Sequence, residues 1–125
     1  MNTASPLTET ETTRLYHTGM QLLTNGNIAD AVEKLVEAAR AGHADAACQL
    51  ARYCSERGKD EDAFYWALMA ANGRHAEAQH MVATMYMDGQ GVPASRADGM
   101  NWHRSAAALG NEASAMFLAA LRSCH

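Results

Sequence analysis

The sequence predicts an all-α protein: a right-handed α-solenoid of about three two-helix repeats followed by a C-terminal helix. Three observations lead to this prediction. Apolar residues make up 48 % of the 125 residues but aromatic residues only 6 %, so alanine and methionine carry much of the apolar content, which favours closely packed helices over strands. Only two prolines, Pro6 and Pro93, interrupt the chain. Finally, a pattern of small residues recurs along it, as in proteins built from stacked repeats.

The recurring pattern is a small residue followed seven positions later by a pair of alanines. Its three copies are Ala31 with Ala38-Ala39, Ala63 with Ala70-Ala71, and Gly99 with Ala106-Ala107. The glycines that follow them, each suited to the left-handed end of a helix, are Gly42, Gly73 and Gly110. A second amphipathic stretch lies upstream of each copy. Each unit is therefore predicted to be two helices that bury their apolar faces only when the units stack.

Equivalent positions of the upstream stretches are Thr18, Leu50, Val82 and Ala119, spaced by 32, 32 and 37 residues. The predicted helices span residues 8–24, 28–41, 44–57, 60–72, 75–88, 95–109 and 112–123. Thr8 with Glu11 forms a capping box at the first of them. We expect a repeat domain over residues 8–125, preceded by a disordered segment over residues 1–7. Gly99, where alanine is usual, and Thr18, where a large apolar residue is usual, suggest looser packing.

Small and large residues in the first and third units follow the patterns of two related repeat families. Those of the first unit are Gly19, Gly26, Ile28, Ala31, Leu35 and Ala38; those of the third are residues 78–92, Trp102, Ala106-Ala107 and Gly110. The first set resembles the tetratricopeptide repeat and the second the Sel1-like repeat, and together they cover roughly residues 8–123. The resemblance implies a bacterial protein-interaction scaffold, an adaptor or regulator that binds a peptide or helix of another protein in its concave groove. Such repeats serve many unrelated partners.

The resemblance also implies that the first helix of each unit lines the concave face, where equivalent positions form three rows. The rows are Tyr16, Cys48, His80 and Phe117; Thr13, Asp45, Glu77 and Ser114; and Met20, Arg52, Thr84 and Leu121. Apart from Ser114, these are the predicted partner-binding residues. Aromatic ends, a carboxylate rim and one central arginine suit a segment with apolar anchors and a basic flank. The alternative is that they are merely exposed helix residues.

Charge and the N-terminal sequence narrow the classes of function. The net charge of −4, from 10 basic and 14 acidic side chains, argues against a nucleic-acid partner or a membrane surface. Residues 1–6 lack the features of a signal peptide, and no apolar run approaches the ~20 residues that span a bilayer, so a cytoplasmic protein is expected. The three cysteines, Cys48, Cys54 and Cys124, lack metal-type spacing and are expected to be free thiols in a reducing compartment.

Several motifs have a simpler structural interpretation than a chemical one. Residues 89–94 fit the dinucleotide pattern Gly-x-Gly-x-x-Ala, but a helix and not a strand precedes them, so a turn is predicted. The six histidines lack the i, i+4 pairing of a helical metal site, and the eight methionines are expected to fill the core and the groove. No metal and no cofactor are expected.

Two alternatives to an adaptor stay open. The nearer one is a dedicated chaperone or inhibitor that masks a secreted or toxic partner. The remote one is a small hydrolase, because Cys48 and His80 are neighbours in the first row and Cys–His pairs can form nucleophiles. No oxyanion hole is recognisable in the sequence, so we predict that the chain is not an enzyme.

Residues 113–121 are apolar nearly all round, whereas a terminal helix normally has a polar outer face. One interpretation is that Phe117, Leu118 and Leu121 form an apolar patch that docks a partner, or a second copy of the chain to give a homodimer. The other is that Phe117 and Met116 fold back onto Trp102.

Overall fold

The computed structural model describes residues 7–123, and its regular secondary structure is helical throughout that range. The helices are α1 (Glu9–Thr24), α2 (Ile28–Arg40), α3 (Ala44–Glu56), α4 (Asp60–Asn72), α5 (Ala76–Asp88), α6 (Arg96–Ala108) and α7 (Glu112–Ser123). These bounds confirm the predicted ones to within one residue. Residues 1–6, most of the segment predicted to be disordered, lie outside the described residues, as do Cys124 and His125.

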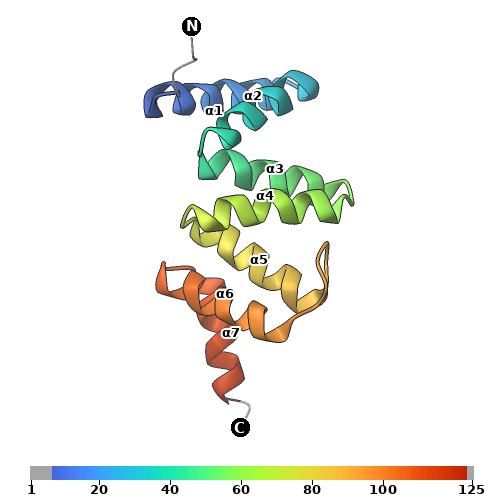
Figure 1. Ribbon diagram of the computed structural model, residues 1–125, viewed down its shortest axis with the longest axis vertical. Helices are drawn as coiled ribbons and strands as arrows, with labels where there is room; N and C mark the ends of the chain where they lie inside the picture. Colours follow the sequence, from blue (N-terminus) through green and yellow to red (C-terminus); the bar gives the residue numbers. More distant parts are fainter. Residues whose placement is uncertain (1–6, 124–125) are drawn as a thin grey trace, which may run out of the picture.

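The helices stack in chain order into an elongated solenoid, with the two chain ends at opposite ends of the stack (Figure 1). The closest packing is within the units α1–α2, α3–α4 and α5–α6, and α7 follows as the first helix of a further unit. This arrangement confirms the predicted all-α solenoid. Within residues 7–123 no helix is long and apolar enough to cross a membrane.

The core is made mainly of alanine. Ala31, Ala38, Ala46, Ala51, Ala63, Ala67, Ala70, Ala78, Ala83 and Ala106 are all completely buried. Only a few larger apolar side chains, such as Leu35, Leu50 and Val82, are as deeply buried. Small side chains let helix axes approach closely, which explains how a chain with few aromatic residues forms a dense stack.

The expectation of looser packing at Gly99 is wrong. Gly99 is buried, and a Cβ atom there would lie 2.6 Å from Sδ of Met87 and 3.1 Å from the carbonyl oxygen of Ala83. A side chain at this position would force the Met87 side chain to move and would crowd the carbonyl of Ala83, so α6 packs closely against α5 here. Thr18 is exposed and leaves no gap in the core.

Residues 89–95 form a turn between α5 and α6, as predicted. Gly89 ends α5 in the left-handed conformation at φ 69°, and Gly91 is also left-handed at φ 74°. A Cβ atom on Gly91 would collide with the carbonyl oxygen of Asp60 at the start of α4. Packing against α4 therefore accounts for Gly91, and a dinucleotide site is not needed to explain it.

Helix caps fix the register of the repeats. The side chains of His43, His75 and Asn111 accept hydrogen bonds from backbone N–H groups three residues later. These equivalent positions are 32 and 36 residues apart, because the turn at 89–95 is longer than the corresponding turn at 57–59. The predicted last spacing of 37 is thus wrong by one residue. Met116, not Phe117, is equivalent to His80, and Leu118, not Ala119, is equivalent to Val82.

Candidate functional site

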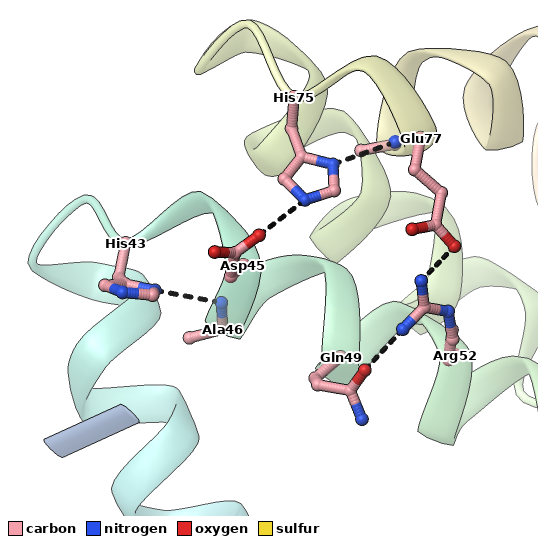
Figure 2. Close-up of polar contacts among 8 residues, drawn as sticks. His43, Asp45, Ala46, Gln49, Arg52, His75 and Glu77 are labelled. Carbon is pink, nitrogen blue, oxygen red and sulfur yellow. Dashed lines mark hydrogen bonds and ion pairs between the residues drawn. The ribbon is translucent and has the colours of Figure 1, made fainter. Parts of the chain in front are cut away.

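Polar contacts join α3 to α5 on the face formed by the first helices of the units, α1, α3, α5 and α7, which we call the first-helix face (Figure 2). Arg52 of α3 forms an ion pair with Glu77 of α5 and a hydrogen bond with Gln49. Nearer the start of both helices, Nε2 of His75 lies 2.7 Å from Oδ1 of Asp45. All four side chains are partly open to solvent, so the ion pair and the His75–Asp45 hydrogen bond each stabilise the fold by about 1 kcal/mol or less. Their main effect is to fix side-chain directions on this face.

His43 and His75 start α3 and α5 in the same way. The Nδ1 atom of His43 accepts the backbone N–H of Ala46 at 3.2 Å, and that of His75 accepts the N–H of Ala78 at 3.1 Å. A ring nitrogen that accepts a hydrogen bond carries no proton, so Nε2 of His75 holds the hydrogen and donates it to Asp45. Burial lowers the pKa of His43, which favours the neutral ring that capping requires.

The predicted residues of α1 lie at the N-terminal end of this face. The Tyr16 ring stacks on that of His43 with centroids 4.5 Å apart, and burial raises the pKa of Tyr16, as does the Asp45 carboxylate to a smaller degree. Met20 is half-buried and packs against the core. Thr13 lines a separate depression of about 410 Å³ formed by α1 alone. These side chains therefore do not share one hollow with Arg52.

Cys48 does not contribute a side chain to the surface. The residue is 1 % exposed, and burial raises the pKa of its thiol to about 11. The prediction that it lines the groove is wrong because the residue belongs to the hydrophobic core cluster. A buried thiol that is protonated at neutral pH also argues against a Cys48–His80 nucleophile.

A depression of about 320 Å³ lies between α3 and α5. Its lining is Arg52, Ser55, Glu56, Glu77, His80, Met81, Thr84, Met85 and Gln90. Four of the predicted residues meet here: Arg52, Glu77, His80 and Thr84. Glu56 also lines the depression but was not among the predicted residues, although it follows Arg52 by one helical turn, a spacing that puts both on one side of α3. The methionines were predicted to fill both the core and the groove, and Met81 and Met85 line this depression.

A buried polar cluster joins α5, α6 and α7. The Oγ atom of Ser114 lies 2.9 Å from Nδ1 of His80 and 2.8 Å from Nδ1 of His103. Ser114 is completely buried and His103 is 2 % exposed. Burial lowers the pKa of His103, and the neighbouring His80 lowers it further. The serine hydroxyl has one proton, so one imidazole accepts it while the other donates to the oxygen.

Some apolar side chains of α7 fold back onto the stack and others face solvent, so each of the two interpretations of this helix holds in part. The Phe117 ring is half-buried and stacks on that of His103 with centroids 4.3 Å apart, so it folds back, but onto His103 and not onto Trp102. Leu118 and Leu121 are half-buried. Met116 is 71 % exposed and does not fold back.

No group of three or more histidine, cysteine, aspartate or glutamate side chains in residues 7–123 is arranged to hold a metal ion. His80 and His103 come together, but their facing Nδ1 atoms are both engaged by the serine hydroxyl. The cluster is therefore suited to holding α7 in place.

Comparison with known proteins agrees with this architecture. The sequence matches the Sel1 repeat at residues 44–75 and 76–111. A Sel1 repeat protein from Oxalobacter formigenes has a similar crystal structure, with 29 % identity, a TM-score of 0.78 and coverage of 86 % of this chain and 87 % of that one.

A second solved structure, that of c5321, a protective antigen present in uropathogenic Escherichia coli strains, displays an SLR fold and has a TM-score of 0.75 at 23 % identity. The match covers 85 % of this chain but 24 % of that protein, so it bears on the fold alone. A search of curated proteins finds no match. The matched repeat units, of 32 and 36 residues, have the spacing that the helix caps show and span more than half of the sequence. The chain belongs to the Sel1 repeat family.

Proposed function

We propose that this chain is a cytoplasmic adaptor or regulator that binds a peptide or helix segment of another protein through the first-helix face. The observation that carries the proposal is the depression between α3 and α5. It places methionine side chains in a hollow on a face whose charged groups are largely paired with one another. A few apolar anchors that enter such hollows commonly supply most of the binding energy of a peptide or helix.

The proposed binding surface is wider than this depression. It comprises Thr13, Tyr16 and Met20 of α1, Asp45 and Arg52 of α3, Glu77, His80 and Thr84 of α5, and Phe117 and Leu121 of α7. Cys48 is left out because it is buried. The free thiols of Cys48 and Cys54 fit a reducing compartment. The raised pKa of Cys48 argues for binding and against the hydrolase alternative.

Affinity capture from the native host tests the proposal. Arg52→Glu reverses the central charge of the face, and Arg104→Glu makes the same change on an exposed position of α6. We expect a partner that the wild type and Arg104→Glu retain and that Arg52→Glu loses while its circular-dichroism melting curve stays normal. Equal retention by all three proteins would show that the partner binds elsewhere. A partner that is soluble only when co-expressed with this chain would favour the chaperone or inhibitor alternative over an adaptor.

We propose a second binding surface on α7. It is suggested by Ala119, which is exposed although the equivalent residues of the other units are buried. By the register of the caps, Ala119 is equivalent to Gly19, Ala51 and Ala83, all of which are buried. The second helix of each unit covers these positions, as the closeness of Gly99 to Ala83 shows. Ala119 is exposed, because no second helix covers α7 within residues 7–123.

The occupant that we propose for this surface is α7 of a second copy of the chain, giving a homodimer. Glu112 starts α7 and Arg122 lies in its last turn. Antiparallel pairing of two such helices about a two-fold axis brings each glutamate near the partner's arginine. Sedimentation should show a weight-average mass that rises with concentration for the wild type and not for Ala119→Glu. The exposed α6 change Ala108→Glu is the control, and a concentration-independent monomer would overturn the dimer.

A further inference from the structure

The depression between α3 and α5 has a fixed base and a deformable wall. Met85 is 4 % exposed and belongs to the core cluster, so it closes the bottom of the hollow. Met81, one turn earlier on α5, is only half-buried. The unbranched thioether side chain of methionine adjusts to apolar groups of different shape. The hollow can therefore accept apolar side chains of several shapes and does not require one particular residue.

Three of the polar residues around the hollow, Arg52, His80 and Thr84, are already hydrogen-bonded within the chain. The Thr84 hydroxyl donates to the carbonyl oxygen of His80 at 3.1 Å, and Nδ1 of His80 is held by Ser114. Arg52 is bound to Gln49 and Glu77. Because these groups have partners, an entering apolar side chain leaves few of them unsatisfied, which is the usual penalty for burying polar groups.

One charge at the rim has no such partner. Arg52, Glu56 and Glu77 are the charged residues of the lining, and Arg52 is paired with Glu77. Glu56 is exposed and forms no ion pair among the described residues. It is the last residue of α3, whose last turn carries no basic residue, so the negative end of the helix dipole adds to its charge. Arg57 next to it is engaged with the ring of Tyr53, 4.9 Å from the ring centroid.

We propose that this depression is a specificity pocket for a partner segment that carries an apolar side chain, of the leucine or methionine kind, and a lysine or arginine within about one helical turn of it. The apolar side chain lies against Met81 and Met85, and the basic group pairs with Glu56 at the carboxyl end of α3. This inference rests on the proposed function and adds to it the chemistry of the segment that is recognised.

The test is selection of displayed random peptides, about twelve residues long, on immobilised protein. Four proteins are compared: the wild type, Glu56→Lys, Met81→Glu and a control, Glu61→Lys, which makes the same charge change on an exposed residue of α4. Circular-dichroism melting first establishes that all four are folded. The best peptides from the wild type are then synthesised, and their dissociation constants are measured by fluorescence anisotropy.

Wild type and Glu61→Lys should enrich peptides with leucine or methionine and a basic residue within four positions. Glu56→Lys should no longer prefer peptides with a basic residue. It should bind the peptides selected on the wild type about tenfold more weakly, which is the scale of one well-placed rim charge. Met81→Glu should lower the affinity for these peptides at least as much. Enriched peptides without a basic residue, or an unchanged preference with Glu56→Lys, would overturn the inference.

Failure of this inference differs from failure of the proposed function. Peptides that bind all four proteins equally but lose affinity with Arg52→Glu would leave the first-helix face as the binding surface and overturn only the chemistry proposed for its pocket. If no peptide is enriched on the folded wild type, both proposals are overturned.

Discussion

Equivalent helices of successive units are joined in two different ways. Between α3 and α5 the links are the Arg52–Glu77 ion pair and the hydrogen bond from His75 to Asp45, whose side chains are partly open to water. Between α5 and α7 the link is the hydroxyl of Ser114, which is completely buried and lies within 2.9 Å of two imidazole nitrogens. The first junction carries more formal charge, but the second removes its polar groups from water.

The comparison shows that burial, more than charge, decides how much each junction stabilises the stack. An exposed ion pair exchanges strong hydration for a screened attraction and gains little. A buried hydrogen bond also gains little in net terms, but its loss leaves a group without any partner, which is costly. The α5–α7 junction should therefore be sensitive to substitution and to protonation, and the α3–α5 junction should be tolerant of both.

The largest expected effect is that of Ser114→Ala. Ala46 and Ala78 occupy the equivalent positions and are completely buried, so alanine fits the space at Ser114. The change removes only the hydroxyl that both imidazoles share, and we expect it to lower the free energy of unfolding by about 1–3 kcal/mol. Urea denaturation measures this. Ser123→Ala, which removes an exposed hydroxyl bonded to the backbone of α7, should change stability by less than about 0.5 kcal/mol.

Lowering the pH should reduce the free energy of unfolding by a smaller amount. Burial lowers the pKa of both His103 and His43 below the ordinary value of 6.5, so the unfolded chain binds more protons than the folded protein just below that pH. The free energy of unfolding should be constant between about pH 7 and pH 8 and fall as the pH is lowered through 6.5 toward the folded-state pKa values.

Two variants assign this pH dependence to its sources. His43→Asn keeps a side-chain cap of the kind that Asn111 provides on α7 and removes one titrating group. His103→Leu removes the other. Each should make denaturation curves at pH 7.5 and 5.5 more similar than they are for the wild type, and stability that rises on acidification would contradict the assignment.

Most of the fold was predictable because its determinants are local and repeated. Small residues seven positions before an alanine pair indicate the helix, and the glycine after them marks its end. At the end of α4, however, the left-handed residue is Arg74 and not the predicted Gly73. The register of α7 was not predictable to the residue, because the turn at 89–95 is longer than the others and packs against α4 through Gly91 and Asp60, which are distant in sequence.

The candidate site was predictable only in part. The resemblance to the repeat families brought Arg52, Glu77, His80 and Thr84 onto one face, and the four line one depression in the structure. It placed Cys48 on the same face, but position in the repeat does not say that this side chain is buried in the core. The His80–Ser114–His103 cluster draws on three helices and has no linear motif. Its only sequence signal is a serine at a position where the aligned units have Ala46 and Ala78, a signal that requires the correct register.

The smallest expected effect is that of the Arg52–Glu77 ion pair. In a double-mutant cycle of Arg52→Ala and Glu77→Ala, we expect a coupling energy of about 0–1 kcal/mol in unfolding, because both side chains are more than a third exposed. The coupling should shrink further in about 1 M salt, where charges are screened over a few ångströms. A coupling as large as the effect of Ser114→Ala would refute the argument from burial. If the coupling is small, the pair contributes mainly by neutralising the centre of the first-helix face, which leaves Glu56 as the charge that a partner meets.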